Sequence, residues 1–132
     1  MDTQQVNLVQ ETFILLSNEA QSVAATFYQR LFEQSPSIRA LFSTEPKMQQ
    51  AKFMHTLSVI VWSLHRSEKF EPIVQELGRS HHAYHIQAEH YPLVRDALLW
   101  SFQQHLGEQF TPAVKQAWQA AYDFIAQAML KA

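Results

Sequence analysis

Apolar residues recur at intervals of three and four positions along most of this chain, and this spacing constrains its fold more than any other feature. Residues at such intervals lie on one face of an α-helix. Glycine occurs only 2 times in 132 residues, and few segments alternate between apolar and polar residues as a strand would. We therefore expect an all-α fold. The first expected helix, residues 3–16, carries Val6, Val9, Phe13 and Leu16 on one face.

Capping and breaking residues divide the pattern into segments with short connections. Pro36 ends the second helix and opens a short turn, Gly107 ends a later helix, and Thr111 followed by Pro112 starts the last one. Pro72 suits the first turn of a short helix that begins near Glu71. The expected long helices cover residues 3–16, 45–65, 71–82 and 89–105, together with a second helix that ends near Ser35 and a last helix that starts at Thr111 and Pro112 and includes Met129.

Composition excludes several classes of protein. The chain has no cysteine, which rules out disulfides, zinc–thiolate sites and thiol nucleophiles. The formal net charge is −2 and there is no long basic run, so we expect no nucleic-acid partner. Neither a signal peptide nor a membrane span is recognisable, so we expect a cytoplasmic protein without a membrane partner. We expect residues 1–132 to form a single domain.

Histidines are the most conspicuous candidates for chemistry, since four of the seven lie within ten residues. His81 follows Leu77 by one helical turn, so the Leu77 carbonyl can accept one ring N–H and leave the other nitrogen for a metal. A surface histidine at a helix end is the simpler interpretation. His81 and His85 also have the spacing of a two-histidine metal site, but no carboxylate completes it. The cluster consists of His81, His82, His85 and His90.

Three further side chains have both a structural and a functional interpretation. Tyr28 either packs with its hydroxyl at the surface or donates a hydrogen bond into a pocket. Gln49 is either solvated or, if it faces a cavity, offers both a donor and an acceptor. Phe42 is most simply a core residue.

Taken in order, several segments resemble bacterial single-domain globins, the globin part of flavohaemoglobins and neuroglobin-like sequences. The segment from Thr26 to Phe42 resembles the second and third globin helices, and residues 52–54 resemble the middle of the distal helix. Leu77-Gly78-Arg79-Ser80-His81 resembles the proximal segment. Residues 106–112 and 117–122 resemble the last corner and the last helix.

The resemblance implies a three-over-three helical sandwich around haem b, with His81 as the iron ligand. It assigns Phe42 to the porphyrin-stacking position and Tyr28 to the distal pocket. Gln49 takes the distal histidine or glutamine position, and Gln50 is the alternative if the register shifts by one. Further expected haem contacts are Phe53, Leu77, His85, Ile86, Tyr91, Val94 and Leu98.

The chain departs from the family pattern at two positions. Phe53 stands over the iron where a smaller aliphatic residue is usual, which should narrow the ligand site. The glutamate that contacts the proximal histidine in flavohaemoglobins would fall about where this chain ends, at Ala132. No flavin or nicotinamide module lies within these residues, so we expect any turnover to need an outside reductase.

The expected function is reversible binding of O2, CO and NO at an iron that is pentacoordinate or weakly hexacoordinate. The alternative is a nitric oxide dioxygenase or peroxidase-like enzyme with a separate reductase, in which Tyr28 and Gln49 would be the catalytic residues. A haem-free globin fold acting as a sensor or interaction module is a third interpretation. A monomer and a homodimer both remain open, and we expect Trp62 and Trp100 to be buried rather than part of a dimer contact.

Overall fold

The computed structural model describes residues 1–42, 45–83 and 86–131. Their regular structure is helical throughout, as the spacing of the apolar residues predicts. The described elements are α1 (Thr3–Ser17), α2 (Ala20–Gln34), the 3₁₀-helix η1 (Pro36–Leu41), α3 (Pro46–Ser63), α4 (Ser67–Ala83), α5 (His90–Leu106), the 3₁₀-helix η2 (Gly107–Gln109) and α6 (Pro112–Leu130).

Local signals in the sequence set most of these boundaries. Gly107 follows α5 with φ of 55°, a left-handed conformation that glycine adopts without strain. The Thr111 side chain accepts a hydrogen bond from the backbone N–H of Val114 at 3.2 Å, and Pro112 occupies the first turn of α6. At the start of α1, Asp2 accepts from the backbone N–H of Gln5 at 2.7 Å in a capping box.

The expected start of the fourth long helix at Glu71 was wrong, because α4 begins at Ser67 and Pro72 lies inside it. The carbonyl of Arg66 accepts from the backbone N–H groups of Lys69 and Phe70 at 3.0 and 2.9 Å. Phe70 is buried and stacks on Phe124 with ring centroids 5.0 Å apart. We attribute the earlier start to burial of this apolar side chain, which outweighs the polar residues around it.

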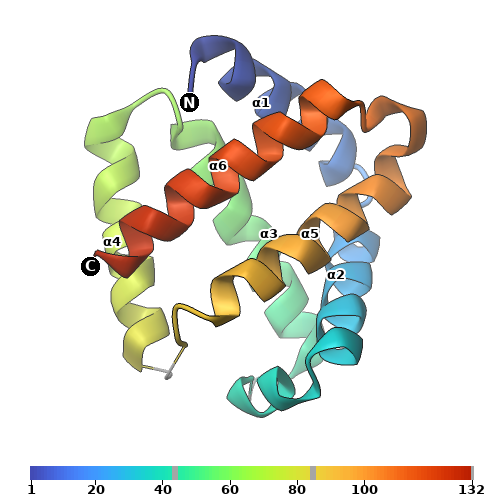
Figure 1. Ribbon diagram of the computed structural model, residues 1–132, viewed down its shortest axis with the longest axis vertical. Coiled ribbons are helices and arrows are strands. Elements are labelled where there is room, and N and C mark those ends of the chain that lie inside the picture. Colours follow the sequence, from blue (N-terminus) through green and yellow to red (C-terminus); the bar gives the residue numbers. More distant parts are fainter. Residues whose placement is uncertain (43–44, 84–85, 132) are drawn as a thin grey trace.

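The helices form two layers, with α5 and α6 crossing in front of the fainter α3 in Figure 1. α2 packs on α3 and α5, whereas α4 packs on α3 and α6. Small residues allow the close crossing of α2 and α5: Ser101 is fully buried and its hydroxyl donates to the backbone carbonyl of Val23 at 2.8 Å. Within the described residues, α4 makes no extensive packing contact with α2 or α5. The helix of His81 and the helix of Tyr28 are therefore held apart by the fold.

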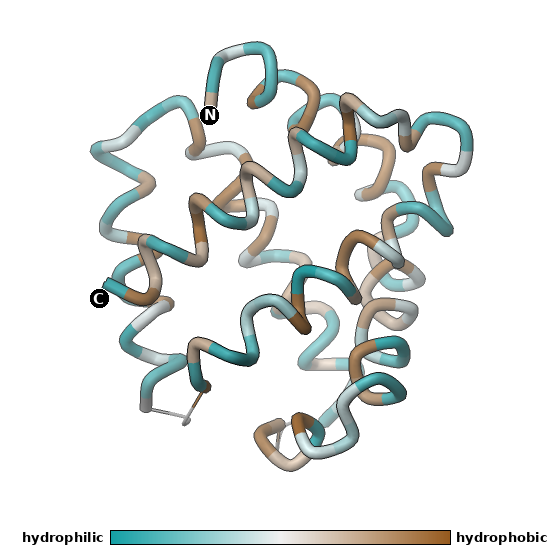
Figure 2. The backbone as a smooth tube through the Cα atoms, in the orientation of Figure 1, coloured by the Kyte–Doolittle hydropathy of each residue, from teal (hydrophilic) through white to brown (hydrophobic). Residues whose placement is uncertain are grey.

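Apolar and polar residues alternate along each helix rather than forming a continuous apolar run (Figure 2). In the part of the chain that the structure describes, no helix combines the length and the hydropathy needed to cross a membrane.

The expectation that Trp62 is buried was wrong, since 49% of the residue's surface is exposed. Trp100 is half-buried, and the guanidinium of Arg30 lies 4.7 Å from its ring centroid.

Candidate functional site

A cavity of about 440 Å³ lies between α2, η1 and the start of α3. It is formed where the chain turns sharply through η1, so that side chains from three consecutive elements meet. Aromatic rings and amide side chains share its wall. The lining residues that matter for its chemistry are Tyr28, Phe32, Arg39, Phe42, Gln49 and Gln50.

Tyr28 is the buried polar group of this cavity, with 8% of its surface exposed. The rings of Phe42 and Phe53 each meet the Tyr28 ring edge-on, with centroids 5.7 Å away. Burial raises the pKa of Tyr28 to about 12, and a polar interaction with the Gln49 side chain opposes that rise. The hydroxyl therefore keeps its proton at physiological pH and can serve as a hydrogen-bond donor. Most of the Tyr28 side chain is buried, and donation by its hydroxyl into the pocket stays a prediction.

Gln49 and Gln50 both line the cavity, and both are half-buried. Gln49 is the residue whose side chain interacts with the Tyr28 hydroxyl. Glu45 caps α3 by accepting from the backbone N–H groups of Lys47 and Met48 at 3.2 and 3.0 Å, which fixes the first turn of the helix. The two glutamines sit in the turn that comes next, so a rigid helix start positions them.

Phe53 belongs to the same aromatic group but is anchored further inside. Its ring stacks on Phe27 with centroids 4.7 Å apart and an interplanar angle of 16°. The side chain is half-buried and packs against the main core cluster. Phe53 also meets the Tyr28 ring, and the expectation that it narrows the ligand site stays a prediction.

His81 lies in the last turn of α4, where the sequence predicts its bond to Leu77. Its Nδ1 is 2.8 Å from the backbone carbonyl of Leu77. Because a carbonyl only accepts, this contact requires a proton on Nδ1 and leaves Nε2 with a free lone pair. Burial lowers the pKa of His81, the Leu77 carbonyl partly offsets that effect, and the nearby His82 lowers the pKa further. The ring is therefore held neutral and in the tautomer that suits a metal ligand.

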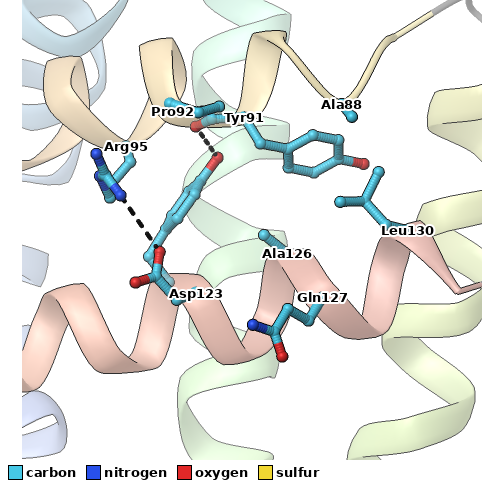
Figure 3. A pocket seen from close by; sticks show the side chains of 9 residues that line it. Ala88, Tyr91, Pro92, Arg95, Asp123, Ala126, Gln127 and Leu130 are labelled. Atoms are coloured by element: carbon cyan, nitrogen blue, oxygen red, sulfur yellow. Dashed lines mark hydrogen bonds and ion pairs between the residues drawn. The ribbon is translucent and has the colours of Figure 1, made fainter.

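Tyr91 marks a second polar position, at the start of α5. It is 7% exposed, and among the described residues its hydroxyl is the buried side-chain oxygen that lacks a hydrogen-bond partner. Burial raises its pKa. Its ring lines a cavity of about 190 Å³ and points toward Leu130 at the end of α6 (Figure 3). Its backbone carbonyl accepts from the hydroxyl of Tyr122 at 2.8 Å, which ties α5 to α6.

The predicted site residues fall into two apolar groups. Tyr28, Phe42, Phe53, Val94 and Leu98 belong to the main core cluster or pack against it. The second cluster contains Tyr91, with Leu77 and Ile86 packed against it. Since α5 supplies residues to both, the two groups meet along one helix. His85 lies outside the described residues.

Sequence reasoning missed Arg39, which also lines the cavity beside Tyr28. Its guanidinium lies 5.6 Å from the ring centroid of Phe32. A usable signal was present, because Arg39 is a cation in the same short turn that positions Phe42.

Among the described residues no group of three or more potential ligand side chains is placed to hold a metal ion. A metal at His81 would therefore need most of its ligands from a cofactor.

The two groups of residues fit a flat apolar cofactor such as haem. One neutral imidazole with a free nitrogen would be available to the iron, and aromatic and aliphatic side chains would supply apolar walls. On the other side of the fold, a protonated phenol and an amide are available as donors. The unsatisfied hydroxyl of Tyr91 lies in the cluster that also receives Leu77, one turn before His81.

An all-α sandwich with a half-buried, neutral histidine on one helix and a tyrosine and a glutamine on two others is typical of cofactor-binding helical proteins. The chain belongs to the globin family, whose model matches residues 25–129. Membership of this family implies haem binding and diatomic gas ligands. The prediction of a globin fold is confirmed.

Three similar proteins show where the chain stands in that family. It is 26% identical to the flavohemoprotein of Bacillus subtilis over 98% of its own length but spans only 33% of that relative. It is 28% identical to an uncharacterized globin-like protein of Aquifex aeolicus, covering 95% of this chain and 88% of the relative. Among solved structures it is similar to an engineered carbene transferase made from a candidate nitric oxide dioxygenase of Rhodothermus marinus, with a TM-score of 0.90, 30% identity and coverage of 99% and 92%.

Proposed function

We propose that this protein binds haem b through His81 and reversibly binds O2 and other diatomic gases beside Tyr28 and Gln49. The observation that carries the proposal is the 2.8 Å contact between His81 Nδ1 and the Leu77 carbonyl, which leaves Nε2 of a half-buried, neutral ring for iron. The whole chain, residues 1–132, would form one globin domain.

When bound, haem would supply the iron that takes the gas ligand, and His81 would hold it. The side chains of the protein would orient the His81 ring and the ligand, and would exclude water from the site. The Leu77 carbonyl fixes the His81 ring, and Phe42, Val94, Leu98 and Ile86 would supply apolar contacts to the bound group. Leu77 and Tyr91 would support the His81 side by packing.

On the distal side, the Tyr28 hydroxyl and the Gln49 amide would donate to the ligand as it gains partial negative charge. Fixed donors in a water-excluded site stabilise such charge more strongly than water does. Because the pKa of Tyr28 is about 12, its donor proton is present throughout the physiological range. Two donors of this kind predict slow release of O2.

The optical spectrum of the purified, haem-reconstituted protein tests this proposal. We expect a Soret band at about 400–415 nm for a histidine-ligated haem. The ferric, deoxy and CO forms should each give a distinct spectrum. A protein that shows no such band after reconstitution would contradict the proposal and favour a haem-free sensor or interaction module.

Gln49 rather than Gln50 is the proposed distal amide, and paired substitutions distinguish the two. We expect Gln49→Leu to raise the O2 dissociation rate constant at least several-fold, since a hydrogen bond to a charged partner contributes about 1.5–3 kcal/mol. Gln50→Leu removes an amide of the same size one position along α3 and should change that rate less than about twofold. Stopped-flow displacement of O2 measures both. The opposite ranking would place Gln50 at the ligand.

Nitric oxide dioxygenation with a separate reductase is the second candidate function. Its support is the likeness to flavohemoproteins and to the engineered variant of a candidate nitric oxide dioxygenase. Tyr28 and Gln49 would then orient O2 for reaction with NO, and reducing equivalents would come from another protein. Steady-state NO consumption with an added flavin reductase tests this role, because a gas carrier alone stops after one turnover.

A further inference from the structure

The cavity of about 190 Å³ beside Tyr91 lies between the first turns of α5 and the second half of α6 (Figure 3). Its described lining shares no residue with the cavity beside Tyr28. An apolar cavity of about 150 Å³ can hold a single aromatic ring, whereas drug-sized ligands occupy about 300 Å³ or more. The size of this cavity therefore suits a molecule with one ring.

The Tyr91 hydroxyl is a hydrogen-bond donor without an acceptor. The residue is 7% exposed, and among the described residues its hydroxyl is the buried side-chain oxygen that has no partner. Burial raises the pKa of Tyr91, so the hydroxyl keeps its proton at neutral pH. Buried polar groups normally have a hydrogen-bond partner in the protein or in a bound molecule. The free hydroxyl therefore indicates a place for an acceptor atom.

The other polar groups at this cavity already have partners. The Tyr122 hydroxyl donates to the backbone carbonyl of Tyr91 at 2.8 Å. At the edge of the cavity, the guanidinium of Arg95 lies 3.3 Å from the Asp96 carboxylate and 3.5 Å from the Asp123 carboxylate. The charge of Arg95 is therefore balanced. An ion that entered the cavity would lose hydration without gaining an unpaired counter-charge, so a neutral ligand is favoured.

Apolar side chains form the wall around the Tyr91 ring. Ala88 comes from the turn before α5, whereas Ala126 and Leu130 come from α6. The ring points toward Leu130, which is exposed and is the last residue of α6 (Figure 3). Exposed side chains change rotamer within nanoseconds. Rotation of Leu130 can thus uncover the hydroxyl for a ligand oxygen.

We propose that this cavity is a second ligand site, and that it takes a small neutral molecule with one apolar ring and one carbonyl oxygen, such as an aryl ketone. The Tyr91 hydroxyl donates to the ligand oxygen, and the ligand ring packs on the alanine and leucine side chains of the wall. The inference goes beyond gas binding and does not depend on it, because the protein alone supplies every group of this site.

Titration of the purified protein with acetophenone tests the proposal, under CO so that any haem iron is already occupied. Two-dimensional NMR of the backbone amides locates the binding site. We expect saturable shifts centred on Tyr91 and Ala126, with a dissociation constant of about 1 mM, as suits a ligand with few non-hydrogen atoms.

Tyr91→Phe removes the proposed donor and keeps the ring. We expect it to weaken acetophenone binding about three- to tenfold, which is the contribution of one neutral hydrogen bond. Binding of ethylbenzene, which has no oxygen atom, should be unchanged. Because the hydroxyl has no partner among the described residues, the substitution should not lower the midpoint of thermal unfolding. A purely structural role of the hydroxyl would lower that midpoint.

A matched pair of alanine substitutions tests the position of the site. Ala88→Leu adds bulk to the cavity wall from an exposed turn and should abolish acetophenone binding. Ala113→Leu makes the same change at an exposed position in the first turn of α6, outside the described lining of the cavity, and should leave binding unchanged.

Several results would overturn the inference without touching the proposed function. One is the absence of saturable binding, and another is a set of shifts centred on Tyr28 or elsewhere on the molecule. Equal weakening of acetophenone and ethylbenzene binding by Tyr91→Phe is a third, since it would show that the hydroxyl does not recognise the ligand oxygen. Failure of the protein to bind haem would overturn the proposed function alone, because the titration does not require haem.

Discussion

Replacing His81 by alanine is expected to lower haem affinity by more than about 100-fold. Loss of outer-shell partners alone typically costs about 10–100-fold in affinity at metal sites, and His81 is the proposed direct ligand. The measurement is the rate of haem transfer to a stronger acceptor, followed at the Soret band.

His82→Ala is the matched control for this substitution. His82 is the next residue along α4 and is exposed, whereas His81 is half-buried and bonded to Leu77. The control should retain haem with nearly unchanged affinity. Imidazole added to the His81→Ala protein should restore part of the spectrum by filling the space of the missing ring. Retention of haem by His81→Ala with an unchanged spectrum would show that another residue ligates the iron.

The contact that fixes His81 could be predicted because it is local. A carbonyl and a ring nitrogen one helical turn apart are brought together by helix geometry alone, and the predicted bond is present at 2.8 Å. The same holds for Gly107 and Thr111, whose roles depend only on adjacent residues. The globin resemblance supplied the order of the remaining elements, which local rules do not specify.

Contacts between distant segments could not be predicted in this way. The hydroxyl of Ser101 bonds to the carbonyl of Val23, 78 positions away, and His105 lies 3.2 Å from the Thr26 hydroxyl, 79 positions away. No spacing rule predicts either contact. The start of α4 was missed for a related reason, since the burial of Phe70 depends on Phe124 in the last helix.

The residues of the candidate site also differ in whether the sequence alone could reveal them. Tyr28, Gln49 and Phe42 were recognisable from their order along the chain, and the structure brings all three to one cavity. The position of Arg39 was not recognisable, because it depends on how η1 places its side chain against Phe32. Charge at the mouth of a pocket is a property of the assembled surface, and the sequence reveals only that an arginine is nearby.

Replacing Tyr28 by phenylalanine is expected to raise the O2 dissociation rate constant at least several-fold and by up to about a hundredfold. A hydrogen bond to a charged partner contributes about 1.5–3 kcal/mol, and each increment of about 1.4 kcal/mol corresponds to a factor of ten. The change removes one oxygen atom and keeps the ring, so the contacts with Phe42 and Phe53 should persist. Stopped-flow displacement of O2 by CO gives the rate directly.

CO dissociation provides the internal comparison, because CO gains little negative charge and should depend weakly on the Tyr28 hydroxyl. Tyr122→Phe is the matched variant: it removes a hydroxyl that donates to the Tyr91 carbonyl, in the other cluster, and should leave O2 release nearly unchanged. The expected effect is therefore specific to the Tyr28 hydroxyl and to the release of O2. An O2 dissociation rate that stays the same in Tyr28→Phe would show that this hydroxyl does not reach the ligand, and slow release would then have to depend on Gln49 alone.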